Sequence, residues 1–423
     1  MASSLSSTLM TTFFVLSLFH LSSVRNHLAA KHIHHGYSSA NHHHHHHRMP
    51  TPYETTKAHH HRMPTPYETT KATTTISNPR LNQAYIALQA WKRVIFSDPY
   101  NFTSNWVGTS VCNYTGVFCS RLPNATKPII TVAGIDLNFA HIAGSLPKEL
   151  GLLSDLALIH LSSNRFCGGI PNTLSNLSLL FELDLSNNRF AGPFPNVVLS
   201  LPSLQYLDIR YNEFEGPLPP QLFSKTFDAI FLNDNLFTSS IPSNIGSSSA
   251  TVLVFANNNF GGCIPSNFAD TLEELVLINN NLTGCVPPQV GYLYKLRVLD
   301  LSSNRLEGPI PYSIAGLAHL EQLNLAHNYM SGLVPEGVCI LPNLMNFTYS
   351  YNFFCVEEGV CRNLTSRGVK FDDRRNCLPE KPLQRSKEQC AAVAKYPVDC
   401  SNFHCSGRSG GAPMALAPAP TPA

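Results

Sequence analysis

Charged side chains are scarce in this chain. They make up 13% of its 423 residues, and the formal net charge at pH 7 is +2. A composition so poor in charge, with no marked basic excess, gives no indication of a nucleic acid partner. Long apolar runs are also missing, because no stretch reaches the roughly 18 to 20 consecutive apolar residues that a membrane-spanning helix needs. The composition therefore predicts a protein that neither binds nucleic acid nor spans a membrane.

Catalytic and metal-binding signatures are missing as well. The sequence contains no His-Glu-x-x-His, no phosphate-binding loop and no Cys-x-x-Cys pair. The histidines outside the N-terminal region are scattered along the chain, at His141, His160, His319, His327 and His404. We therefore expect neither an enzyme nor a cofactor nor a metal centre.

The most prominent feature of the sequence is an asparagine that recurs at a regular interval. Its members are 22 to 24 residues apart, and they are Asn164, Asn188, Asn212, Asn235, Asn258, Asn280, Asn304, Asn328 and Asn352. Each closes a block of one form, such as Leu183-x-Leu185-x-x-Asn188-x-Phe190, and the earlier block Ile135-x-Leu137-x-x-Ala140 keeps the period without the asparagine. Self-similarity near 24 residues indicates a leucine-rich repeat solenoid with about ten turns.

The repeat has a direct physical basis. Leucines two apart on a short strand point to the same side and fill the interior of the coil. The asparagine amide can satisfy buried backbone groups between stacked turns, and the following Ile-Pro step turns the chain away from the strand. The sequence therefore predicts an α/β fold, a right-handed coil of about ten plant-type repeats. We expect a concave parallel β-sheet and a disulfide-bonded cap at each end.

Six segments follow from composition. An apolar run within residues 1–30 predicts a signal peptide and secretion to the extracellular space. Residues 31–77 form a His-rich, low-complexity segment with a tandem duplication, for which a disordered spacer or a tag is favoured over a metal site. Residues 78–132 are assigned to an N-terminal cap that opens with a helix over 81–95, and 133–356 to the repeats. A Cys-rich cap over 357–405 and an Ala/Pro-rich tail over 406–423 complete the chain.

Twelve cysteines, an even number, favour disulfides in an oxidising compartment. Cys112 and Cys119 are expected to pair in the N-terminal cap. Cys263 and Cys285 occupy the same position in adjacent turns, each five residues after the repeat asparagine, which predicts a bond between them.

The remaining cysteines gather mostly near the C-terminus. Those expected to stabilise the C-terminal cap, with open connectivity, are Cys355, Cys361, Cys377, Cys390, Cys400 and Cys405. Cys167 and Cys339 have no evident mate. A homodimer linked through Cys167 or a cap cysteine is therefore a further hypothesis.

N-glycosylation is predicted by seven Asn-x-Ser/Thr triplets. They begin at Asn101, Asn113, Asn124, Asn176, Asn281, Asn346 and Asn363. Together with the apolar N-terminus and the cysteines, these triplets support secretion.

The binding hypothesis rests on the residues that alternate with the inward leucines. Residues 133–257 hold ten acidic and five basic side chains, a net charge of −5. The candidate peptide-binding residues are Asp136, Phe139, Glu182, Asp184, Tyr206, Asp208, Arg210, Tyr211, Phe231 and Asp234. Carboxylates among aromatic rings suit a basic, partly apolar partner. The alternative is that an aspartate in Leu-Asp-Leu only solvates the strand.

The C-terminal stretch 362–408 has the opposite charge balance. It carries ten basic and five acidic residues, a net charge of +5. Pectin or another acidic wall polysaccharide is a candidate partner, and a solvated cap surface is the alternative.

Several phrases outside the repeat consensus resemble the plant leucine-rich repeat extensins of the cell wall. They span roughly 78–405 and include Asn78-Pro-Arg-Leu81, Ser97-Asp-Pro99, Val111-Cys-x-Tyr-x-Gly-Val-Phe-Cys119, Leu207-Asp-Ile-Arg-Tyr-Asn212 and Pro397-Val-Asp-Cys400. The resemblance implies a secreted scaffold whose repeats bind basic, cysteine-rich peptides of the rapid alkalinization factor class. It also implies a role in wall formation and integrity during cell growth.

Two points qualify what the resemblance implies. The family's tail consists of Ser-Pro-Pro-Pro-Pro units with cross-linking tyrosines, whereas this chain ends in alternating Ala and Pro from Ala412 to Ala423. Such an end has the pattern of a hydroxylated, arabinogalactan-bearing segment, and anchoring by tyrosine cross-links is not expected of it. The alternative function is that of a polygalacturonase inhibitor, a plant solenoid of similar length that binds a secreted pectin-degrading enzyme.

Overall fold

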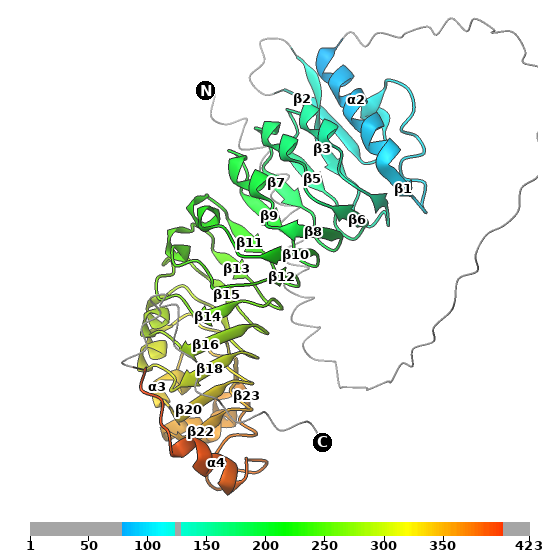
Figure 1. Ribbon diagram of the computed structural model, residues 1–423. Helices are drawn as coiled ribbons and strands as arrows, with labels where there is room; N and C mark the ends of the chain where they lie inside the picture. The colour runs from blue at the N-terminus through cyan, green and yellow to red at the C-terminus, as the bar shows by residue number, and fades with distance from the viewer. Residues whose placement is uncertain (1–77, 123–127, 401–423) are drawn as a thin grey trace, which may run out of the picture. The chain divides into compact units, whose positions relative to one another are not determined.

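The chain forms a coil, and a sheet of twelve strands extends along it (Figure 1). The structure is a computed structural model, and it describes residues 78–122 and 128–400. The predicted signal peptide, the His-rich spacer, Asn124, Cys405 and the Ala/Pro-rich tail lie outside the described residues. All the described residues belong to one unit, Ala72–Ala423.

The N-terminal cap begins with helix α2 (Pro79–Val94). Asn78 caps it, since the side chain accepts a hydrogen bond from the Arg80 N–H at 3.0 Å, and Pro79 occupies the first helical position, where no N–H is needed. The helix buries one face, and on it Trp91 packs edge-on against Trp106 with ring centroids 6.0 Å apart. The predicted helix over 81–95 is confirmed.

The long sheet provides one strand for each repeat. Strand β2 (Val117–Arg121) pairs antiparallel with β3 and starts the sheet, while all later pairings are parallel. The ten repeat strands are β3 (Ile130–Asp136), β5 (Leu158–His160), β7 (Glu182–Asp184), β9 (Tyr206–Asp208), β11 (Ala229–Phe231), β13 (Val252–Val254), β15 (Glu274–Val276), β17 (Val298–Asp300), β19 (Gln322–Asn324) and β21 (Asn346–Thr348). The solenoid prediction is confirmed.

The repeat asparagines connect successive turns, as expected. In the turn of Asn212, the side-chain amide donates to the carbonyls of Leu185, Ile209 and Arg210 at 3.0–3.1 Å. Its carbonyl oxygen accepts from the Phe190 N–H of the preceding turn at 3.0 Å. The residue just before each asparagine has a left-handed backbone, with φ between 52° and 61° from Ser163 to Tyr351, so the chain leaves the strand through the same sharp turn every time.

Aromatic rings fill the interior over the first half of the coil. The residue two after the repeat asparagine is phenylalanine in five consecutive turns, and these rings stack with centroids 6.1–6.4 Å apart. They are Phe166, Phe190, Phe214, Phe237 and Phe260, all fully buried. Because each ring contacts the next, the core is continuous from turn to turn.

Shorter strands form a second layer in each turn, after the asparagine. They make a six-stranded sheet of β1 (Ile95–Ser97), β4 (Ala143–Gly144), β6 (Arg165–Gly168), β8 (Arg189–Pro193), β10 (Glu213–Gly216) and β12 (Leu236–Phe237). A five-stranded sheet contains β14 (Gly261–Cys263), β16 (Asn281–Cys285), β18 (Arg305–Gly308), β20 (Tyr329–Val334) and β22 (Phe353–Glu357). This second layer is split into two sheets between β12 and β14, where the repeats are only 22 and 23 residues long.

Most repeats return to the next strand through one short helical turn, whereas the connection from β14 to β15 has none. The 3₁₀ segments are η1 (Val111–Asn113), η2 (Lys148–Leu152), η3 (Asn172–Asn176), η4 (Asn196–Ser200), η5 (Pro220–Ser224), η6 (Ile245–Ser247), η7 (Pro288–Tyr292), η8 (Tyr312–Gly316) and η9 (Gly359–Arg367). The α-helices α3 (Glu336–Cys339) and α4 (Lys387–Ala394) lie near the C-terminal end.

The coil continues past residue 356, where the sequence analysis placed the end of the repeats. Strand β23 (Lys370–Asp372) pairs in parallel with β21, and Asn376 follows Asn352 by 24 residues. Its amide donates to the carbonyls of Tyr349 and Asp373 at 3.0 Å, as a repeat asparagine does. The Cys-rich segment therefore contains a further strand of the solenoid.

Disulfides close both ends, as predicted, but one predicted bond is wrong. Cys112 pairs with Cys119. Cys285 pairs with Cys400, 115 residues away, and therefore not with Cys263, which is itself disulfide-bonded. Equal positions in stacked turns allow a bond, but the C-terminal segment folds back over β16 and β18 and brings Cys400 to Cys285 and Gly308.

Two further bonds lie in the C-terminal region. Cys377 pairs with Cys390, whereas Cys339, which had no evident mate, pairs with Cys361. Among the described cysteines, Cys167 and Cys355 are free. Cys167 is half-buried, whereas Cys355, which was expected in a cap disulfide, is exposed. The homodimer stays a prediction.

Candidate functional site

Two rows of side chains cover the outer side of the twelve-stranded sheet, hereafter the sheet face. The first row follows strict strand register through Asp136, His160, Asp184, Asp208, Phe231, Val254, Val276, Asp300, Asn324, Thr348 and Asp372. The second row is Phe118, Gly134, Leu158, Glu182, Tyr206, Ala229, Val252, Glu274, Val298, Gln322, Asn346 and Lys370. The first row confirms the alignment expected from the repeat period.

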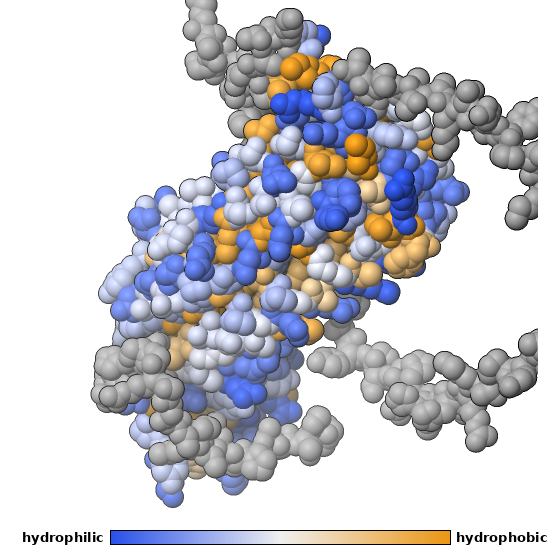
Figure 2. Space-filling model, turned by 45° about the horizontal axis from the view of Figure 1, so that its top comes forward, coloured by the Kyte–Doolittle hydropathy of each residue, from blue (hydrophilic) through white to orange (hydrophobic). Residues whose placement is uncertain are grey.

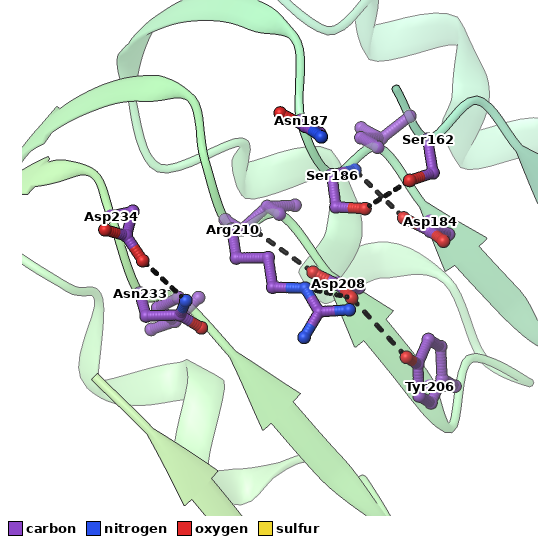
Figure 3. Close-up of polar contacts among 12 residues, drawn as sticks. Ser162, Asp184, Ser186, Asn187, Tyr206, Asp208, Arg210, Asn233 and Asp234 are labelled. Atoms are coloured by element: carbon purple, nitrogen blue, oxygen red, sulfur yellow. Dashed lines mark hydrogen bonds and ion pairs between the residues drawn. The ribbon is translucent and has the colours of Figure 1, made fainter. Parts of the chain in front are cut away.

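An ion pair occupies the middle of the N-terminal half of this face. Arg210 Nε lies 3.0 Å from Asp208 Oδ2, and the Arg210 backbone N–H donates to Oδ1 at 3.1 Å (Figure 3). The Tyr206 hydroxyl lies 3.5 Å from the same carboxylate, and the Arg210 guanidinium is 5.3 Å from the centre of the Phe231 ring. These four residues, with Glu182 and Asp184, form what we call the acidic-aromatic cluster.

Burial changes the charge of this cluster. Asp208 is fully buried, and its burial, with the nearby Asp184 carboxylate, raises its pKa to about 8 even though Arg210 acts in the opposite direction. Burial and the charge of Asp208 likewise raise the pKa of Tyr206. Asp208 therefore lies beneath the surface and positions Arg210, while the half-buried Asp184 presents its carboxylate beside it.

A histidine and a glutamate extend the cluster toward the N-terminal cap. His160 Nε2 lies 2.9 Å from Glu182 Oε2. Burial lowers the pKa of His160, but Glu182, Asp184 and Asp136 together outweigh it and raise the pKa above its usual value. His160 therefore keeps its proton to a higher pH than an ordinary histidine does.

Another carboxylate, that of Asp234, lies on the loop after β11. Asp234 accepts hydrogen bonds from the side-chain amides of Asn233 and Asn257, each at 2.8 Å. Tyr211, which is 49% exposed, also contacts Asp234 by a side-chain hydrogen bond. In the described part of the chain the buried Asn233 Oδ1 has no hydrogen-bond partner, so an acceptor is left beside the cluster.

Most of the predicted binding residues share this region, and two lie nearer the cap. Asp136 and Phe139 are on the first turn, and Phe139 is 61% exposed. Sequence reasoning missed Phe118, which is 57% exposed and pairs with Gly134 on the sheet face. Phe118 lies on strand β2, which runs antiparallel and is outside the repeats, so the repeat period could not predict its position on the sheet face.

Hydrophobic and hydrophilic side chains are interleaved on the surface that Figure 2 shows. In the described residues, no group of three or more His, Cys, Asp or Glu side chains could hold a metal ion. No described helix has the length and apolar character to cross a membrane.

Comparison with known proteins agrees with this architecture. The leucine rich repeat N-terminal domain family matches residues 81–120, and leucine rich repeat models match 155–177, 179–201, 203–224 and 270–330. The chain is 58% identical over 336 residues to leucine-rich repeat extensin-like protein 6 of Arabidopsis thaliana, which covers 78% of this chain and 70% of that relative.

The chain belongs to the leucine-rich repeat extensin-like proteins.

Within this family the matched length varies. Pollen-specific leucine-rich repeat extensin-like protein 4 of Arabidopsis thaliana is 65% identical over 79% of this chain, but the match spans only 48% of that relative. The chain thus spans about half the length of some of the leucine-rich repeat extensin-like proteins that it matches.

A solved receptor has a similar coil. The ectodomain of the Arabidopsis receptor kinase HAESA, in complex with an extended IDA peptide hormone, is 29% identical to this chain with a TM-score of 0.60. The match covers 71% of this chain and 50% of the receptor chain. This leucine-rich repeat extensin-like protein therefore shares its solenoid architecture with the ectodomain of a receptor that was solved with a peptide hormone.

Proposed function

We propose that this protein is an extracellular cell-wall scaffold that binds a basic, cysteine-rich peptide of the rapid alkalinization factor class. The peptide would bind over the acidic-aromatic cluster, and the complex would act in wall formation and integrity during cell growth. The observation that carries the proposal is the in-register row Asp136, His160, Asp184 and Asp208 beside exposed aromatic rings. The proposed role is binding, without catalysis.

Charge complementarity supports a cationic partner. Asp136, Asp184 and Asp234 are half-buried, so each keeps a carboxylate edge at the surface. The Arg210 guanidinium lies against the buried Asp208 side chain, so it points into the protein and not toward a partner. A basic peptide would be attracted by these three half-buried carboxylates, and binding would cost only part of their desolvation.

Aromatic side chains supply a large contact area and lose little conformational entropy on binding. Tyr211 and Phe139 are 49% and 61% exposed, and the ring centroid of Tyr206 lies 5.9 Å from that of Phe231. Exposed rings near a carboxylate suit lysine and arginine side chains, which combine an apolar stem with a charged end. Binding energy at protein interfaces concentrates on such residues.

The comparisons support peptide binding in general terms. The HAESA ectodomain is solved with a peptide hormone, and the curated relatives carry the name extensin-like. The peptide class and the wall role come from the family resemblance. We extend the proposal to pectin as a second partner, for which the basic C-terminal stretch 362–408 is the candidate contact.

Calorimetric titration of the secreted full-length chain with a folded, disulfide-bonded rapid alkalinization peptide tests the proposal. The double substitution Asp184→Asn/Asp234→Asn removes two half-buried carboxylates and keeps the size of both side chains. We expect it to weaken binding by about tenfold or more at low salt. Asp208 is left unchanged because it is buried.

A matched control is available in the second layer. Glu213 and Glu215 are exposed on β10, so Glu213→Gln/Glu215→Gln makes the same change in charge away from the sheet face. The control should bind as the unmodified protein does. Equal weakening by both variants would mean that only net charge matters, and no binding by the unmodified protein would refute the peptide assignment.

A further inference from the structure

One glycosylation triplet lies on the sheet face. Asn346 and Thr348 are the first and last residues of β21, and the Phe347 between them points into the core and is fully buried. Since neighbouring strand residues point to opposite sides, Asn346 and Thr348 both point outward. They belong to the same two rows of side chains as the acidic-aromatic cluster.

The surroundings of Asn346 leave its amide accessible. Its neighbours in register are Gln322 on β19 and Lys370 on β23, and both are exposed. By contrast, the amide nitrogens of Asn176 and Asn281, two of the triplet asparagines outside the sheet face, donate to Gly151 O and Asn259 Oδ1. Asn346 makes only backbone hydrogen bonds among the described residues.

We propose that Asn346 carries an N-linked oligosaccharide on the sheet face and that this glycan keeps protein-sized partners away from β19, β21 and β23. The donor is an oligosaccharide on a lipid diphosphate. Asn346 Nδ2 forms a bond to the anomeric carbon as the bond from that carbon to the phosphate oxygen breaks. The lipid diphosphate leaves, and the amide gives up one of its two protons.

The position of this glycan limits the peptide surface. Neighbouring strands are about 4.8 Å apart, so β21 lies five strand spacings, about 24 Å, from β11 at the edge of the acidic-aromatic cluster. An N-linked glycan is bulky and hydrated. It therefore covers the C-terminal end of the sheet face and leaves the cluster open. This consequence for the peptide rests on the proposed function, whereas the modification and the shielding do not.

Occupancy and shielding are measured on the full chain secreted from plant cells, without any peptide. Enzymatic removal of glycans in heavy-oxygen water marks each formerly modified asparagine, and mass spectrometry should find Asn346 marked in most molecules. An unmarked Asn346 overturns the modification. The rate at which an amine-reactive polyethylene glycol labels Lys370 should rise several-fold in Asn346→Gln, while the rate at the exposed Lys148 stays constant. Equal rates at Lys370 overturn the shielding.

Moving the glycan toward the cluster tests the consequence for binding. Val252→Asn/Val254→Thr creates a triplet on β13, next to β11, and Val252→Asn/Val254→Ala is the control that has the asparagine without the triplet. We expect peptide binding to be lost only in the first variant and to be unchanged in Asn346→Gln. Loss of binding in Asn346→Gln would overturn the excluding role. Binding that survives a glycan on β13 would instead refute the location of the peptide site and leave the glycan at Asn346 established.

Discussion

Replacement of one repeat asparagine should destabilise the coil far more than replacement of its neighbour. Asn280 is buried, and its amide donates to the carbonyls of Phe255, Leu277 and Ile278 at 3.0–3.3 Å. Its own carbonyl oxygen accepts from the Phe260 N–H at 3.0 Å. Asn280→Ala removes all four hydrogen bonds at once.

The magnitude follows from the backbone groups that lose their partner. The Phe260 N–H, enclosed between turns, is left without a partner, which costs about 1–3 kcal/mol. The carbonyls of Phe255, Leu277 and Ile278 keep other hydrogen bonds, so each bond that they lose counts for only about 0.5–1.5 kcal/mol. We therefore expect Asn280→Ala to lower the free energy of unfolding by about 3–7 kcal/mol.

The adjacent Asn279 is the matched control. It is exposed, with φ of 55°, and its amide makes one hydrogen bond, to Asn257 Oδ1 at 3.0 Å. Glycine adopts this backbone conformation without strain, so Asn279→Gly should change the free energy of unfolding by less than about 1 kcal/mol.

Urea denaturation followed by two probes measures the effect. The only two tryptophans, Trp91 and Trp106, are buried in the N-terminal cap, so fluorescence reports on the cap. Far-ultraviolet circular dichroism reports on the whole sheet. Coincident shifts of both transitions would show that the loss at Asn280 is transmitted through the stacked core to the cap. A loss for Asn280→Ala as small as that for Asn279→Gly would refute the role assigned to the asparagine.

Three further predictions concern other parts of the fold. Burial raises the pKa of Asp208 to about 8, so the native state keeps a proton that the unfolded state loses near pH 4, and stability should fall as pH rises from about 4 to 8. Asp208→Asn should flatten that part of the profile in denaturation curves, and parallel profiles would contradict the raised pKa. Gly291 packs against the backbone of the next turn, so Gly291→Ala should lower stability by about 1–3 kcal/mol in urea titrations, whereas Gly169→Ala, at an open position, should have no effect. The Cys285–Cys400 bond closes a loop of 115 residues, so Cys285→Ala/Cys400→Ala should lower stability by about 4–5 kcal/mol. The urea midpoint should fall accordingly, and a midpoint equal to that of the oxidised parent would contradict this role of the bond.

The repeat period was sufficient to predict the coil and the composition of its sheet face. Each turn is built from local contacts and from contacts with its two neighbours, so a pattern of 22 to 24 residues specifies strand, turn and register together. Asp136, His160, Asp184 and Asp208 align in the structure for that reason. The same logic would have identified Asn376 as a further repeat asparagine.

Features outside the period depended on the tertiary structure. The partner of Cys285 is 115 residues away in a segment with no repeat, so spacing alone favoured the wrong cysteine. The burial of Asp208 depends on the side chains of Tyr206 and Arg210 closing over it, and the repeat consensus does not encode those side chains. Phe118 reaches the sheet face because an antiparallel strand of the cap extends the sheet. Sequence by itself thus determined the solenoid and the rows of side chains along it, because these depend on neighbouring turns. Tertiary contacts between distant segments decided which of those side chains are exposed, charged or cross-linked.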